Sequence, residues 1–249
     1  MILPNRKDSF DENGVQVLIS LVDKIIEENA SENIPGSDEF LISGRCLNSL
    51  LKAAASYCEG VKDFVREHIS VYICLCDVLA FQAQFKESLE VSRKALEVAN
   101  KSMVNEYIAE STMYCANAAI SCALALASTL VEKAENGGEI HVPEEVENEA
   151  VELIDTVIDY THDAYLMYLK IAIEGAAKLG LVDAILIDKL DDDSILDTVG
   201  ILSNALEEAG QKDEIVPIID SLNLAVEMNE KVGLREGFDC SAVILTVLV

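Results

Sequence analysis

The sequence contains no tryptophan, and it has few prolines and glycines: 4 and 12 in 249 residues. Disordered and linker-like chains are rich in such residues and poor in apolar ones, whereas 51% of this chain is hydrophobic. Aromatic residues make up only 5%, which suits helices that pack through Ala, Leu, Ile and Val. The composition therefore predicts a globular protein rich in helix.

Basic residues are also scarce, with 18 Lys and Arg against 45 Asp and Glu, so the net charge is −27. Affinity for DNA or RNA begins with Lys and Arg contacts to phosphates. We therefore expect no nucleic-acid partner. A basic protein or peptide is the partner class that this charge favours.

Several motifs that carry chemistry are missing. The chain has no Cys-x-x-Cys pair, no glycine-rich phosphate loop and no nucleophile elbow. Its seven cysteines are odd in number and lie mostly in apolar runs, which is typical of reduced thiols, and the first residues lack the apolar run of a targeting signal. We expect a cytoplasmic protein that needs no cofactor and no catalytic residue.

The stretch from Met113 to Val131 contains no charged residue. A row of small residues recurs there at every fourth position, which places them on one helix face: Ser111, Cys115, Ala119, Ala123 and Ala127. Such a face lets another helix approach closely. We expect this segment to be the most buried helix, at the centre of a helical array. A membrane span is the alternative by length, but the many small residues favour a buried helix and no membrane span.

Apolar residues recur at helical spacing almost throughout the chain. Breaks in the pattern predict helices over about 13–30, 37–59, 61–82, 85–100, 103–135 and 143–179, with a short apolar piece at 181–190 and further helices up to about 237. We expect a single all-helical domain over 1–249, or two abutting halves over about 13–135 and 143–249.

One pair of these helices resembles a tetratricopeptide repeat (TPR). The matching positions are Tyr72, Leu75, Cys76, Leu79, Phe85, Ser88, Ser92, Ala95 and Asn100. The sequence departs from the family pattern at Cys76, Ser92 and Asn100. A second, weaker resemblance to the same repeat runs from Leu196 to Met228. The resemblance implies an all-α, TPR-like array of antiparallel helices that acts as a protein-interaction or scaffolding module. The long central helices make it more similar to a 14-3-3-style array than to a regular superhelix.

Acidic residues on the long helix over 143–179 support an alternative function. His162-Asp163 resembles the metal-binding pair of HD-type phosphohydrolases, with His68, His141 and Asp183 as nominal further ligands. Asp159 and His162 have the i, i+3 spacing of helical metal sites, and Glu149 and Glu152 resemble the Glu-x-x-Glu of helical nucleotide pyrophosphohydrolases. These residues would serve a metal-dependent hydrolase. Our interpretation is a solvated polar helix face without a metal.

The segment from Ser241 to Val249 is apolar and β-branched, unlike its acidic surroundings. Apolar side chains left in water promote association. We expect this tail to dock in a groove of its own array or on a second copy, which would make a homodimer. The acidic balance leaves a third function open, an inhibitor or immunity protein that masks a basic toxin or nuclease.

Overall fold

The computed structural model describes residues 11–30, 38–61, 63–135, 143–190, 195–210 and 212–237. Within these ranges the chain forms eight α-helices and one short 3₁₀ helix, and no strand. In chain order they are α1 (Glu12–Ala30), α2 (Asp38–Cys58), α3 (Val65–Phe81), α4 (Phe85–Ser102), α5 (Asn105–Glu135), α6 (Glu144–Lys178), η2 (Ala184–Lys189), α7 (Ile195–Ala209) and α8 (Val216–Gly237). The predicted all-α class is confirmed.

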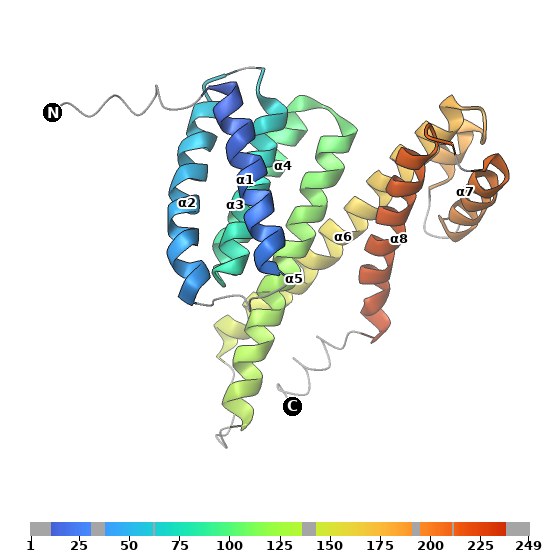
Figure 1. Cartoon of the computed structure of the whole chain (residues 1–249). Helices are drawn as coiled ribbons and strands as arrows, with labels where there is room; N and C mark the ends of the chain where they lie inside the picture. The colour runs from blue at the N-terminus through green and yellow to red at the C-terminus, as the bar shows by residue number, and fades with distance from the viewer. Residues whose placement is uncertain are drawn as a thin grey trace.

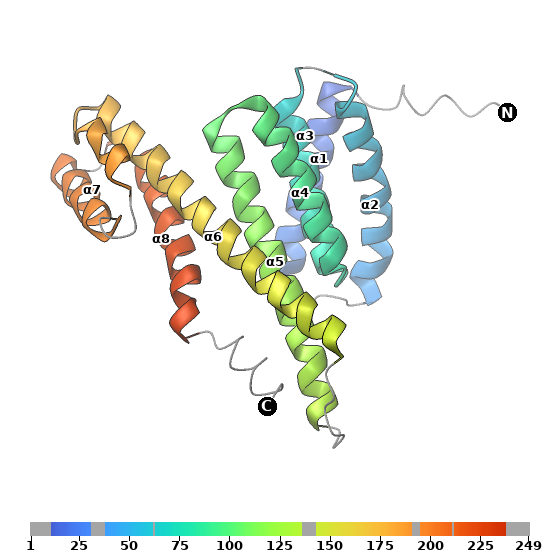
Figure 2. The same ribbon diagram turned by 180° about the vertical axis from the view of Figure 1, so that it is seen from behind.

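Most helices pack antiparallel against the next helix in the chain. This holds for α2 on α3, α3 on α4, α4 on α5 and α5 on α6, whereas α1 packs more closely on α3 than on α2. In Figure 1, α1 to α4 and one end of α5 form a bundle, and α6 runs diagonally away from it, with α7 and α8 at its far end. Figure 2 shows the other side, where α6 crosses in front of α5. The two long helices therefore connect the two ends of the molecule.

The α3–α4 hairpin is held by small residues at its centre. The Ser88 hydroxyl donates to the Cys76 carbonyl at 3.0 Å, and the Cys76 thiol donates to the Ser88 carbonyl at 3.5 Å. Ser92 and Ala95 are completely buried beside them. Because these side chains are short, the two helices can approach closely. The predicted pairing of helices over 61–82 and 85–100 is thus confirmed.

The backbone conformation of Gly180 explains why α6 ends where it does. Gly180 adopts φ +71°, in the left-handed region that glycine occupies at little cost. Its N–H donates to the Ala177 carbonyl, and the Leu181 N–H donates to the Ala176 carbonyl, both at 3.0 Å. This is the hydrogen-bond pattern of a Schellman cap.

The most buried described helix is α3, not α5 as expected. Ten of the 17 residues of α3 are buried, because neighbouring helices cover several of its sides. The small-residue row of α5 is buried from Ser111 to Ala127, but the opposite side of α5 exposes Leu124 and Ser128. The row itself packs as predicted: Ala119 and Cys122 join a cluster with Leu89 of α4 and Leu153 of α6.

By length and composition, α5 could also cross a membrane. Its segment Asn105–Thr129 has a mean hydropathy of 1.2, and 39% of the window is buried within the fold. The buried helix of a soluble protein can have the same length and hydropathy. The small residues of α5 that are buried between α4 and α6 are typical of such a helix.

Two main hydrophobic clusters lie at opposite ends of the molecule. The first joins α1 to α4 around Leu51, Val71 and Leu79. The second joins α6, η2, α7 and α8 around Leu169 and Ile173, and it also includes Ala109 of α5. The boundary between clusters therefore falls within α5 rather than at 136–142, and the division into one domain or two halves stays a prediction.

The segment from Leu196 to Met228, which resembles the repeat more weakly, packs differently from the α3–α4 hairpin. Its second helix, α8, packs along α6, and α7 has few close backbone contacts with its neighbours. Leu202 and Leu206 attach α7 to the second cluster through side chains. The predicted short piece at 181–190 contains η2. His141 and the tail over 241–249 lie outside the described residues.

Candidate functional site

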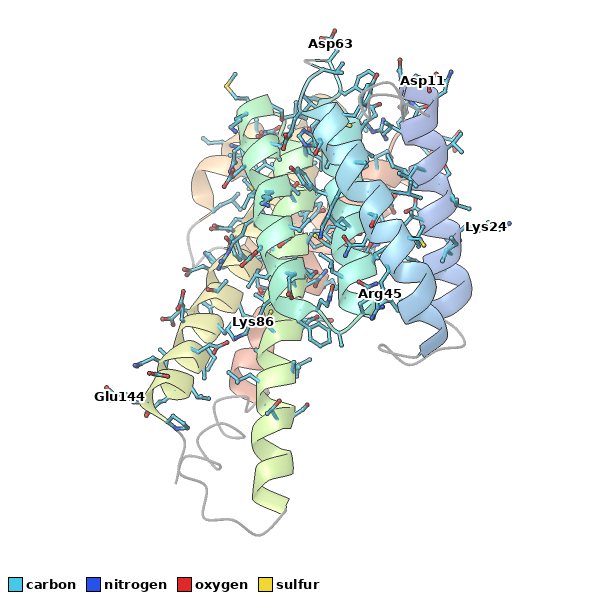
Figure 3. All side chains as sticks on the ribbon, turned by 90° about the vertical axis from the view of Figure 1, so that its left-hand side faces the viewer. Asp11, Lys24, Arg45, Asp63, Lys86 and Glu144 are labelled. Atoms are coloured by element: carbon cyan, nitrogen blue, oxygen red, sulfur yellow. The ribbon has the colours of Figure 1, made fainter. Side chains whose placement is uncertain are left out.

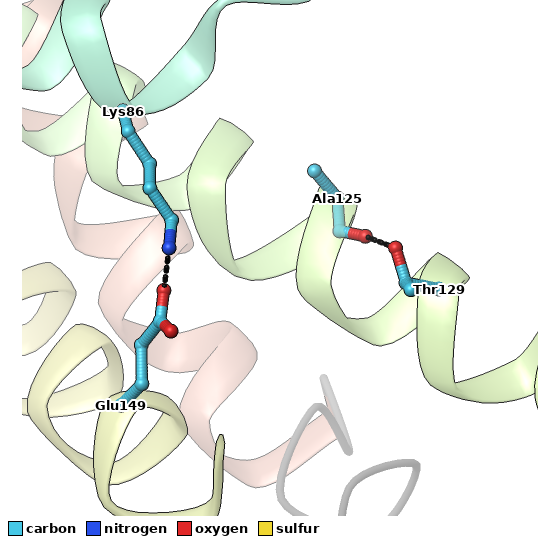
Figure 4. A network of polar contacts seen from close by, with 4 residues as sticks. All are labelled: Lys86, Ala125, Thr129 and Glu149. Carbon is cyan, nitrogen blue, oxygen red and sulfur yellow. Dashed lines mark hydrogen bonds and ion pairs between the residues drawn. The ribbon is translucent and has the colours of Figure 1, made fainter. Parts of the chain in front are cut away.

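The α6 residues that suggested a metal site do not gather around a common point. Glu152, Asp159 and Asp163 are exposed on α6, and His162 is half-buried. Glu149 forms an ion pair with Lys86 at the start of α4, drawn in Figure 4 beside the Thr129–Ala125 hydrogen bond of α5. No group of three or more His, Cys, Asp or Glu side chains in the described ranges is arranged to bind a metal ion.

The nominal further ligands have other environments. His68 is buried on α3 and stacks on Tyr72, with the ring centroids 4.7 Å apart. Burial lowers the pKa of His68, so the ring is neutral at neutral pH. The Asp183 carboxylate accepts a hydrogen bond from the Ile185 N–H at 3.0 Å and caps η2. The capping role accounts for Asp183, whereas the Nε2 atom of His68 is buried without a hydrogen-bond partner.

A different set of acidic residues lies on the other side of the central helices. Asp77 of α3 shares one side of this helix with Arg66 and Ser70; Arg66 is exposed, and Ser70 and Asp77 are half-buried. The Cys74 thiol, on the turn before Asp77, donates to a carboxylate oxygen of Asp23 on α1 at 3.4 Å. This hydrogen bond joins α1 to α3 about one helical turn before Asp77.

Asp77 has the most perturbed carboxyl group of the described residues. Burial and, after it, the negative charge of Asp23 raise the pKa of Asp77 from its ordinary 3.8 to about 7. Both causes act against the charged form, because the site removes water and places a like charge nearby. The surroundings of Asp77 therefore favour its neutral form.

Two tyrosines extend this environment across α5 and α6. Burial raises the pKa of Tyr114, and the negative charges of Asp77 and Glu110 raise it further. Burial likewise raises the pKa of Tyr168, with contributions from Glu110 and from Glu227 on α8. The Tyr168 hydroxyl donates to the Met113 sulfur at 3.9 Å.

We use the name acidic face for Asp23, Asp77, Glu110 and Glu227 together with Tyr114 and the buried Tyr168, which these charges affect. These residues belong to α1, α3, α5, α6 and α8; in Figure 1, α1 lies in front of α3, and α6 passes behind α5 and α8. Arg66 opposes the acidic charge locally, since it lowers the pKa of Glu110 against a larger rise caused by burial. Of this set, Asp23, Glu110 and Glu227 are exposed.

Sequence reasoning missed this face because its members come from five helices. One signal was present, since Asp77 is the lone charged residue in the run from Ile69 to Phe81. A carboxylate in the middle of a buried helix is unusual unless it has a partner or a role. Which residues of α1 and α5 would face it depends on packing that a single sequence does not specify.

The fold defines an all-helical protein with sequential antiparallel packing. No family model matches the chain, and no curated protein and no solved structure matches it either.

Proposed function

We propose that this protein is an interaction or scaffolding module that binds a basic protein or peptide through the acidic face. The observation that carries the proposal is the setting of Asp77, a half-buried carboxyl group on α3 whose pKa is raised by burial and by the negative charge of the exposed Asp23 on α1. A lysine or arginine side chain placed between them would relieve their repulsion. The net charge of −27 adds a long-range attraction for the same class of partner.

The face also supports a finer version of the proposal. The α3–α4 hairpin nests through Ser88 and Ala95, two of the positions that resemble a TPR, and through Ser92, where the sequence departs from the family pattern. Arrays of nested helix pairs present a side on which residues from several helices meet. The acidic face draws on α1, α3, α5, α6 and α8 in this manner, so we infer a TPR-like mode of peptide binding.

Fluorescence anisotropy with a labelled octa-arginine peptide tests the proposal. The double variant Asp23→Asn/Glu110→Gln removes two charges from the acidic face, and Glu152→Gln/Asp163→Asn removes two exposed charges from α6 as the matched control. We expect the first to weaken binding by about ten-fold or more, because each lost charge-assisted contact contributes roughly 1 kcal/mol. The control should change binding less than two-fold, because its two charges lie outside the acidic face and an exposed charge without a direct contact contributes about 0–1 kcal/mol.

Two results would oppose the proposal. Equal losses in both variants would show that the peptide responds to net charge alone, and unchanged binding in both would remove the acidic face from consideration. Binding should also tighten as the pH rises through 7, because Asp77 then becomes charged.

A thermal-shift measurement distinguishes the alternative function, a metal-dependent hydrolase, from this proposal. Mg²⁺ or Mn²⁺ that bound the α6 carboxylates would raise the melting temperature by mass action. The Glu152→Gln/Asp163→Asn variant should lose such a shift. An inhibitor or immunity function would use the acidic face itself, and it predicts capture of a basic nuclease with loss of the activity of that nuclease.

A further inference from the structure

We propose that Met113 is an oxidation site, at which hydrogen peroxide converts the thioether to a sulfoxide and the Tyr168 hydroxyl holds the new oxygen by a hydrogen bond. The site lies in the contact between α5 and α6. The inference concerns this contact and does not depend on the proposed binding of a basic partner.

Two methionines of the α5–α6 contact each lie beside a hydroxyl group from the opposite helix. The Tyr168 hydroxyl of α6 donates to the Met113 sulfur of α5 at 3.9 Å. One residue away on each helix, Thr112 of α5 places its hydroxyl oxygen 3.9 Å from the Met167 sulfur of α6. Both methionines are half-buried, so a small oxidant can reach them, whereas Met228 is completely buried.

The hydroxyl group of Tyr168 is a donor whose acceptor is weak. Thioether sulfur accepts hydrogen bonds poorly, and the Tyr168 side chain is only 7% exposed. Burial raises the pKa of Tyr168, and the charges of Glu110 and Glu227 raise it further, so the hydroxyl keeps its proton. A buried donor without a good acceptor is destabilising. A sulfoxide oxygen on Met113 would supply that acceptor.

The oxidation step needs only the peroxide and the sulfur. The Met113 sulfur gives two electrons to the O–O bond, which breaks; one oxygen bonds to sulfur, and the other leaves as water. Oxidation usually disrupts packed contacts, because it makes an apolar side chain polar. At Met113 the hydrogen bond from Tyr168 offsets that loss, so the α5–α6 contact takes up the oxygen without loosening.

Met167 provides the matched control. Its neighbour Thr112 also donates to the Ile108 carbonyl at 2.7 Å, a much shorter hydrogen bond than the 3.9 Å contact with sulfur. A hydroxyl group has one proton to donate, so the Thr112 proton is already engaged. A sulfoxide on Met167 therefore gains no such hydrogen bond, although the two hydroxyl–sulfur distances are equal.

Urea denaturation before and after peroxide treatment tests the proposal in the full chain. In the variant Met103→Leu/Met167→Leu, peroxide at about pH 5 oxidises Met113 and spares cysteine, because the thiolate is the reactive form of cysteine; peptide mass spectrometry verifies both. The oxidation penalty is the factor by which oxidation raises the equilibrium constant of unfolding. We expect this penalty to be about five-fold larger when Tyr168→Phe is added, which is the contribution of one net hydrogen bond.

The control comparison uses Met103→Leu/Met113→Leu, in which Met167 is oxidised instead. Adding Thr112→Val, which keeps the shape of the side chain, should change the oxidation penalty by less than about two-fold, because the threonine proton is engaged elsewhere. Met1 is common to all variants, so its oxidation cancels in both comparisons.

The proposal is overturned by any of three outcomes: an equal penalty with and without Tyr168→Phe, a change as large in the control comparison, or a Met113 that stays reduced in the folded protein while the 85% exposed Met103 of the wild type is fully oxidised. Tyr168→Phe removes only a hydroxyl group and is expected to fold.

A second measurement needs no oxidant. Met113→Gln places an amide oxygen, a better acceptor than sulfur, on a side chain of similar length, and Met113→Leu places none. The equilibrium constant of unfolding of Met113→Gln relative to Met113→Leu should rise about five-fold when Tyr168→Phe is added to both. An unchanged ratio would overturn the proposal as well.

Discussion

Gly175, in the last turn of α6, lies against Ile218 of α8. A Cβ atom added there would lie 2.9 Å from Cγ1 of Ile218 and 3.4 Å from its Cδ1. Carbon atoms in contact prefer separations of about 3.5–4.0 Å. Because Ile218 is 6% exposed and belongs to the second hydrophobic cluster, it has little room to move away. Gly175→Ala should therefore strain this contact.

Gly200, in the middle of α7, provides the matched control, since a Cβ atom there would meet nothing within 4 Å. Alanine is favoured over glycine in a helix interior by about 1 kcal/mol at either position. Gly200→Ala should raise the free energy of unfolding by roughly 0.5–1 kcal/mol. Gly175→Ala has the same gain but adds an overpacking cost of about 1–3 kcal/mol, so it should be neutral or destabilising by up to about 2 kcal/mol.

Urea denaturation followed by circular dichroism measures both variants, and the difference between them isolates the crowding. A third variant, Ile218→Ala, completes a double-mutant cycle with Gly175→Ala. The coupling should be favourable and about as large as the crowding cost, because removing Ile218 makes room for the new methyl group. If Gly175→Ala and Gly200→Ala stabilise the protein equally, α8 does not lie on α6 as described.

Three further predictions concern the rest of the chain. Ala119→Leu should lower the free energy of unfolding by about 1–3 kcal/mol, because this completely buried position between α4 and α6 has no space for added carbons; an unchanged melting temperature would contradict this. At about pH 8, Ellman's reagent should modify the exposed Cys46 quickly and reach Cys122 only on unfolding, since burial raises the pKa of the Cys122 thiol to about 11; fast labelling of Cys122 in the native protein would refute its burial. Deleting residues 241–249 should lower the melting temperature if the tail docks on its own array, or convert a dimer to a monomer if it docks on a second copy; unchanged stability and molecular mass would exclude both.

Helical periodicity predicted the class of fold and most helix boundaries. Gly180 signalled the end of α6 and the small row from Ser111 to Ala127 signalled a buried contact, because glycine conformation and side-chain size are local properties. Burial of whole helices was harder to predict. The uncharged run in α5 suggested the most buried helix, but α3, which contains Asp77, is covered on more sides.

The candidate site was beyond the reach of local patterns. The α6 carboxylates have suggestive spacings, yet a spacing within one helix does not bring ligands from other helices to the same point. The effect of Asp23 on Asp77 has no spacing signal at all, since the two residues are separated by the whole of α2. It depends on the packing of α1 on α3, as Figure 3 shows from the side of these helices.

That same packing has a consequence for how the chain folds. Pairing of neighbouring helices keeps contacts short in sequence, and such topologies fold fast. Most of the pairings from α2 to α6 can form as soon as each helix leaves the ribosome, because each helix finds its partner in the segment made just before it. α1 is the exception, since its main partner is synthesised only after α2. Between the synthesis of α1 and that of α3, the apolar stripe of α1 should remain exposed to solvent. We expect chaperones to recognise the nascent chain in this interval.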